Sequence, residues 1–127
     1  MKHVNIGQIE AIHRMLCAET GGDAGLREMA LLESAVGAID QTFDGQELYP
    51  TLIEKAARLG YSLIANHAFV DGNKRIGMLV MLTFLALNGL EIDPAVDEVT
   101  RVGLAVASGE MRYTALLDWI GFYQSQV

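Results

Sequence analysis

The sequence lacks several features that would place it outside the cytoplasm. Its single cysteine, Cys17, cannot form an internal disulfide, and this usage fits a reducing compartment. The longest apolar run, Met78 to Leu87, spans about ten residues and is interrupted by Thr83, whereas a membrane-spanning helix needs about 20. The N-terminus has no apolar core of the kind found in export signals. We therefore expect a cytoplasmic protein with no membrane contact.

Positive charge is also scarce. Nine lysines and arginines stand against sixteen aspartates and glutamates, with a pI near 4.8. Nucleic-acid binding needs a positive field along the phosphate backbone, so we expect no direct nucleic-acid contact. Hydrophobic residues make up 51% of the chain, which indicates either a very apolar core or an apolar surface that meets a partner.

No stretch alternates at the two-residue period of a strand. Apolar residues instead recur at helical spacing in the segments 9–16, 32–39, 52–64, 76–87, 99–106 and 116–120. Asn5 is placed to cap the first helix, Gly21 is placed to end it, and Pro50 suits the first turn of the third. We predict one all-α domain over residues 1–127, a compact bundle of about six helices. At most a short extended piece is expected near Leu90 to Ile92.

The segment "HAFVDGNKR", from His67 to Arg75, lies between the two most apolar predicted helices. Its "DGN" part is ordinary turn chemistry, but a turn needs neither the histidine nor the arginine. His67 can accept a proton, Asp71 can hold a divalent cation, and Gly72 lets the backbone approach an anion closely. The following helix N-terminus, with Lys74 and Arg75, attracts phosphate. The combination predicts a phosphate-transfer site, with Phe69 plugging the loop into the core.

The same segment resembles the H-x-F-x-[DE]-[GA]-N-x-R signature of the Fic/Doc family, which it matches at His67, Phe69, Asp71, Gly72, Asn73 and Arg75. The stretch "GGDAGLREMALLESAV" and the chain length resemble the Doc-like branch of that family. The resemblance implies a helical bundle in which the active-site loop joins two central helices.

The resemblance also implies a role for each residue of the loop. His67 would act as general base on a hydroxyl of a target protein, and Asp71 would bind Mg²⁺ on the phosphates of ATP. Asn73 and Arg75 would hold those phosphates, with Gly72 against them. This chemistry is reasonable, because an imidazole with a pKa of about 6.5 can accept the proton of a weakly nucleophilic hydroxyl.

Lys74 bears on which phosphate is transferred. Most family members have glycine at this position and transfer AMP, whereas members with lysine resemble Doc and present the γ-phosphate to the histidine. The resemblance therefore implies a protein kinase activity with Lys74 and His67 as catalytic residues. Two alternatives stay open: Lys74 points into solvent and the chain transfers AMP, or the chain is a catalytically silent interaction module.

Doc-like proteins are toxins of toxin–antitoxin modules. The resemblance implies that the target is elongation factor Tu, phosphorylated on a threonine so that translation stops. No Ser or Thr starts the [ST]-x-x-x-E-[GN] motif with which larger members restrain themselves, so inhibition is expected from another chain. A disordered antitoxin tail that folds into an apolar groove would suit this absence.

Three further residues lie outside the motif. Glu19 and Leu79 stand where Doc-like proteins can carry polar or basic nucleotide contacts, so auxiliary nucleotide binding departs from the family pattern. His13 lies on an apolar helix stripe, and we interpret it as a core or groove residue rather than a ligand.

Overall fold

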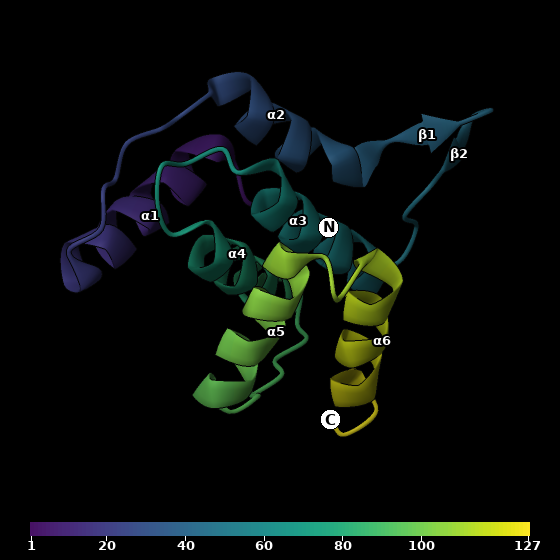
Figure 1. The fold of residues 1–127 in the computed structure, drawn as a ribbon. Coiled ribbons are helices and arrows are strands. Elements are labelled where there is room, and N and C mark those ends of the chain that lie inside the picture. The colour runs from purple at the N-terminus through teal and green to yellow at the C-terminus, as the bar shows by residue number, and fades with distance from the viewer.

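The structure is a computed structural model that describes residues 1–127. It contains the helices α1 (Ile6–Thr20), α2 (Met29–Gly37), α3 (Leu52–Asn66), α4 (Asn73–Leu87), α5 (Val96–Ser108) and α6 (Tyr113–Gln124). A short 3₁₀ turn η1 (Ala38–Asp40) and the strands β1 (Thr42–Phe43) and β2 (Gln46–Glu47) join α2 to α3. Figure 1 shows α3 and α4 between α1 and α2 on one side and α5 and α6 on the other. The prediction of an all-α bundle is confirmed.

Local capping residues begin the helices that carry the site. The Asn5 side chain accepts from the Gln8 N–H and the Gln8 side chain accepts from the Asn5 N–H, so a capping box starts α1 as its sequence predicts. Thr51 and Glu54 form the same box at the start of α3. The expected place of Pro50 in the first turn of α3 is therefore wrong, because Pro50 precedes the Thr51 cap.

The two central helices pack closely because each has a glycine at their contact. A Cβ atom on Gly77 would lie 2.4 Å from Cγ1 of Ile64 and 3.1 Å from the carbonyl oxygen of Gly60. A Cβ atom on Gly60 would lie 2.7 Å from Sδ of Met81. A side chain at either position would displace the facing side chain or separate the two helices. This contact fixes the two helix ends between which the loop 67–72 runs.

The strand content lies in a different place from the one expected. Residues 90–92 form no strand; instead the Leu90 N–H donates to the Leu85 carbonyl at 3.0 Å and completes the end of α4. The strands flank Asp44 and Gly45, both with positive φ, as a two-residue hairpin turn requires. The hairpin projects from the helices in Figure 1.

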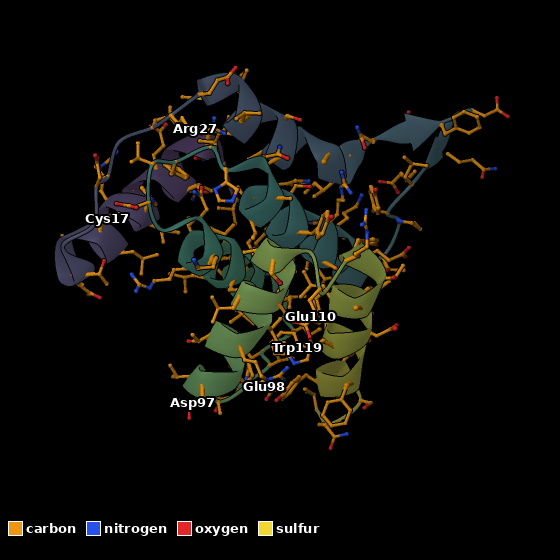
Figure 2. All side chains as sticks on the ribbon, in the orientation of Figure 1. Cys17, Arg27, Asp97, Glu98, Glu110 and Trp119 are labelled. Atoms are coloured by element: carbon orange, nitrogen blue, oxygen red, sulfur yellow. The ribbon has the colours of Figure 1, made fainter.

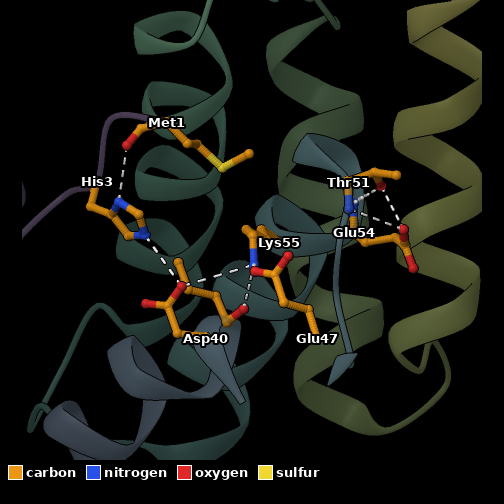
Figure 3. A network of polar contacts seen from close by, with 8 residues as sticks. Met1, His3, Asp40, Glu47, Thr51, Glu54 and Lys55 are labelled. Carbon is orange, nitrogen blue, oxygen red and sulfur yellow. Dashed lines mark hydrogen bonds and ion pairs between the residues drawn. The ribbon is translucent and has the colours of Figure 1, made fainter. Parts of the chain in front are cut away.

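A buried lysine attaches this hairpin to α3 (Figure 3). Lys55 is 4% exposed, and its Nζ donates to the Ile39 carbonyl and to Oε1 of Glu47, both at 2.9 Å. Oδ1 of Asp40 lies 3.9 Å from the same nitrogen and 3.4 Å from Nε2 of His3. The positive charge of Lys55 is therefore balanced within the chain.

A second polar contact joins α5 to α6 (Figure 2). Trp119 donates its indole N–H to Oε1 of Glu98 at 2.9 Å, and the Tyr123 hydroxyl donates to Oε2. Both hydrogen bonds lower the pKa of Glu98, and the one from Tyr123 has the larger effect.

No helix of the chain is both long and apolar enough to cross a membrane.

Candidate active site

The loop between α3 and α4 begins at His67 in a left-handed backbone conformation. His67 has φ 51° and ψ 51°, which is uncommon for a residue with a side chain. Its imidazole is exposed, and Nδ1 lies 3.3 Å from Nδ2 of Asn73. The left-handed residue ends α3 and turns the chain toward the buried pair Ala68 and Phe69.

Asn73 is the buried residue that holds the shape of this loop. It is 6% exposed; Oδ1 accepts from the Phe69 N–H at 3.1 Å and Nδ2 donates to the Phe69 carbonyl at 2.9 Å. These bonds fix the orientation of the amide, so Nδ2 faces Nδ1 of His67. The side chain of Asn73, expected on phosphate, is thus occupied by the loop and the imidazole.

A segment from the α1–α2 connection runs along the outside of the loop. The Arg27 N–H donates to the Ala68 carbonyl at 2.7 Å, and the Val70 N–H donates to the Gly25 carbonyl at 2.9 Å. The Arg27 guanidinium also donates to the carbonyls of His67, at 2.8 Å, and Asn66, at 3.3 Å. Figure 2 labels Arg27 beside the loop. Arg27 thereby satisfies carbonyls at the end of α3 that have no partner in the helix.

Sequence reasoning did not find the role of Arg27. The residue is exposed and shares no spacing with the loop that it contacts across 40 positions. Its position in "GLRE", just before a helix, carries no signal for this contact. Only the fold brings the two segments together.

The far end of the loop faces a small polar pocket. Gly72 has φ 80°, a conformation that suits glycine, and it precedes α4 without a side-chain cap. The first N–H groups of α4 are therefore left for a ligand or water. The pocket has a volume of about 240 Å³ and is lined by Leu16, Cys17, Thr20, Gly22, Asp71, Gly72, Lys74 and Arg75.

Four of the predicted site residues, Asp71, Gly72, Lys74 and Arg75, line this pocket, whereas His67 and Asn73 do not. The side chains of Lys74 and Arg75 form no ion pair within the chain. Oδ2 of Asp71 accepts from the Asp23 N–H at 3.1 Å. The predicted base and the predicted phosphate-binding groups therefore stand at opposite ends of one loop.

Asp71 is the carboxylate available to a metal at this pocket. No three His, Cys, Asp or Glu side chains come together as a metal cluster. Mg²⁺ is commonly held by one or two carboxylates together with substrate phosphates and water. A single carboxylate beside two cations thus fits an Mg²⁺ ion that arrives with a nucleotide.

An apolar groove adjoins the polar pocket on the α4–α5 side. It has a volume of about 490 Å³, shares Leu16, Lys74 and Arg75 with the pocket, and is otherwise lined by Met78, Leu79, Leu82, Val96, Val99, Thr100, Gly103 and Leu104. Leu79, a position considered for nucleotide contact, thus lines the groove. Glu19 is exposed on α1 and lines neither cavity, whereas its neighbour Thr20 lines the pocket.

Comparison with known proteins identifies the family of the chain. A sequence model of the Fic/DOC family matches residues 3–85, a range that includes the whole loop and both central helices up to Leu85. The chain belongs to the Fic/DOC family. Toxin Doc of Mycolicibacterium smegmatis is 44% identical over 72 residues, which cover 57% of this chain and 55% of that protein. The chain thus matches about half of the length of that relative. Protein kinase doc of Escherichia phage P1 is 25% identical over 118 residues, 93% of this chain and 92% of that protein.

Proposed function

We propose that this protein is the toxin of a toxin–antitoxin module and transfers the γ-phosphate of ATP to a Ser or Thr hydroxyl of a translation factor. Elongation factor Tu is the target that the family resemblance implies. The observation that carries the proposal is the loop 67–75, which presents an exposed imidazole at one end and unpaired cations around a polar pocket at the other. The names of both relatives support it.

The pocket supplies what a polyphosphate needs. Lys74 and Arg75 provide positive charge, the uncapped N-terminus of α4 provides N–H donors, and Gly72 leaves room for close approach. Asp71 would hold the Mg²⁺ that neutralises charge on the phosphates. These groups bind and orient the nucleotide.

His67 supplies the base. Nδ1 of its imidazole lies 3.3 Å from Nδ2 of Asn73, a contact that orients the exposed ring, and the ring nitrogen that carries no proton in the neutral imidazole would be the base. In the transfer step the hydroxyl oxygen forms a bond to the γ-phosphorus and the bond from that phosphorus to the β–γ bridging oxygen breaks. ADP leaves with the bonding electron pair, and the hydroxyl proton passes to His67. Such a base contributes about 10²–10⁴ in rate.

Lys74 would decide which phosphate faces His67. Its side chain lines both the polar pocket and the groove, so an ammonium lies at the border of the space that the distal phosphates would occupy if the α-phosphate faced His67. When the γ-phosphate lies beside His67, the rest of the nucleotide extends toward the ammonium of Lys74. Transfer of AMP would require the opposite orientation, and it is the main alternative outcome of the test below.

The apolar groove is the part of the surface that suits an antitoxin tail. Apolar side chains of α4 and α5 line it, and Lys74 and Arg75 stand at its polar end. An amphipathic segment with an acidic end would bury its apolar face there and place its charge beside the two cations. Such a segment would also obstruct the nucleotide pocket, because the two cavities share these residues.

Labelled ATP tests the proposed reaction. The purified protein is incubated with cell lysate or elongation factor Tu and with ATP labelled separately at the α and the γ position. We expect label on a protein from γ-ATP and none from α-ATP, with His67→Ala as the inactive control. Transfer of α-label would make the protein an adenylyltransferase, and no transfer from either would favour a silent interaction module.

A further inference from the structure

His13 lies directly beneath the phosphate end of the loop, although it belongs to α1. The residue is 1% exposed, and its ring stacks on Phe69 with centroids 3.8 Å apart and planes 20° from parallel. Its Nε2 donates to the carbonyl oxygen of Asp71 at 2.6 Å across 58 positions of sequence. Any buried imidazole N–H needs a hydrogen-bond partner, and for His13 that partner is a backbone carbonyl of the loop 67–72 rather than a group of α1.

The hydrogen bond acts on the peptide that enters α4. The Asp71 carbonyl and the Gly72 N–H belong to one planar trans peptide, so they point in opposite directions. Because His13 holds the carbonyl on its own side, the Gly72 N–H points away from His13. A carbonyl turned toward the pocket would instead place negative charge beside the phosphates.

The ring also restricts how this peptide can move. A Cβ atom on Gly72 would lie 3.3 Å from Nε2 of His13, so the ring is packed directly beneath the left-handed turn. Phe69 is held in turn by the two hydrogen bonds between its backbone and the side chain of Asn73. The phosphate end of the loop is therefore supported by His13 and its base end by Asn73.

We propose that His13 is a positioning residue that fixes the Asp71–Gly72 peptide for phosphate binding. The inference rests on the proposed function for the identity of its ligand. It goes beyond the expectation of a core or groove residue, because the hydrogen bond to Asp71 controls the orientation of a backbone group in the site. His13 lies outside the pocket lining and acts through the loop.

Two substitutions separate the ring from the hydrogen bond. His13→Phe keeps an aromatic ring against Phe69 and removes the donor. His13→Gln removes the ring but places an amide Nε2 the same number of bonds from Cβ. Ile9→Ala is the matched control, because Ile9 lies one turn earlier on the same buried face of α1 and cannot donate to the loop.

The readouts are the affinity for Mg²⁺–ATP by titration calorimetry, KM for ATP and kcat, amide hydrogen exchange over 67–75, and the melting temperature. We expect His13→Phe to weaken Mg²⁺–ATP binding and raise KM by about three- to tenfold, the range of one neutral hydrogen bond, with a smaller change in kcat. Exchange at Val70, whose N–H donates to the Gly25 carbonyl in the same loop, should accelerate as the loop loosens. His13→Gln should recover part of the affinity, and Ile9→Ala should lower the melting temperature without changing affinity.

The inference is overturned if His13→Phe binds Mg²⁺–ATP within twofold of wild type with unchanged exchange at Val70. It is also overturned if Ile9→Ala loses as much affinity as His13→Phe. If His13→Phe does not fold, His13→Met replaces it in the comparison with His13→Gln. A wild-type protein that binds Mg²⁺–ATP but transfers no label contradicts the proposed function alone. If wild type does not bind Mg²⁺–ATP, unchanged exchange at Val70 in His13→Phe still overturns the role of His13.

Discussion

Lys55 and Lys74 lie near the starts of the two central helices, but their surroundings are opposite. Lys55 is buried and its ammonium is satisfied by a backbone carbonyl and the carboxylate of Glu47, with Asp40 close by (Figure 3). Lys74 is exposed beside Arg75 at the edge of a polar pocket, and neither forms an ion pair within the chain.

The difference separates a cation that stabilises the fold from one that we propose binds a ligand. A buried charge needs partners from its own chain, because desolvation would otherwise cost several kcal/mol. Two adjacent cations next to free helix N–H groups repel each other unless an anion joins them. We therefore expect substitutions at the loop to change catalysis and binding, and substitutions around Lys55 to change stability.

The largest effect is expected at His67. His67→Ala should lower phosphate transfer by at least about 100-fold, because it removes the base, while the melting temperature stays nearly unchanged because the imidazole is exposed. Transfer from γ-labelled ATP and thermal unfolding measure the two quantities. Activity within a few fold of wild type would remove His67 from the mechanism.

A smaller but still large loss is expected at Lys74. An ammonium near a polyphosphate favours one arrangement of the nucleotide by about 1–3 kcal/mol, so Lys74→Gly should lower γ-transfer about tenfold to a hundredfold. Transfer of α-label by the variant would show that the side chain sets orientation. Undiminished γ-transfer would show that the Lys74 side chain points into solvent and does not contact the nucleotide.

Asp71→Asn tests the metal at the same pocket. The amide oxygen of asparagine can still accept from the Asp23 N–H, so the loop should keep its shape while a hard cation loses a charged oxygen ligand. Transfer should fall and be partly restored by raised Mg²⁺. Wild-type activity that persists in excess chelator would contradict a metal role for Asp71.

Lys55→Met tests the opposite side of the comparison. The substitution leaves the Ile39 carbonyl without its partner and releases Glu47, so the free energy of unfolding should fall by about 1–3 kcal/mol. Denaturant titration measures this loss. Transfer at a temperature at which the variant is folded should remain within twofold of wild type, and a larger change would link the hairpin to catalysis.

The smallest effect is expected between α5 and α6. The hydrogen bonds that lower the pKa of Glu98 stabilise the fold at any pH above 4.5, the ordinary pKa of a glutamate. This contribution is lost as the pH falls through the lowered pKa of Glu98. Glu98→Gln should therefore be slightly less stable than wild type at neutral pH, and the difference should shrink in acid. Melting temperatures across that range would show whether it does.

The sequence predicted the helices well because their signals are local. Apolar spacing, the Asn5 cap and the Gly21 end act within one or two turns, and the structure has them as expected. The hairpin was missed although Asp44-Gly45 is a known turn signal, because its strands are only two residues long and exposed. Pro50 was misplaced because Thr51 and Glu54 make a better start.

The site was predictable only in part, for a related reason. The loop carries its chemistry in nine consecutive residues, so pattern alone found the members of the pocket that lie on it. Its supports come from elsewhere: Arg27 contacts the loop across 40 positions and His13 across 58. Contacts at such separation leave no periodic pattern in one sequence. They arise only because the fold places α1 and the segment before α2 against the loop.

Binding of Mg²⁺–ATP tests most directly whether the unpaired cations of the loop serve a phosphate ligand. Titration calorimetry on wild type, Lys55→Met and the double variant Lys74→Gly/Arg75→Gln, with melting temperatures of all three, makes the comparison. We predict that wild type and Lys55→Met bind alike although Lys55→Met melts lower, and that the double variant loses binding without melting lower. Equal binding by the double variant, or loss of binding in Lys55→Met while folded, would contradict the account.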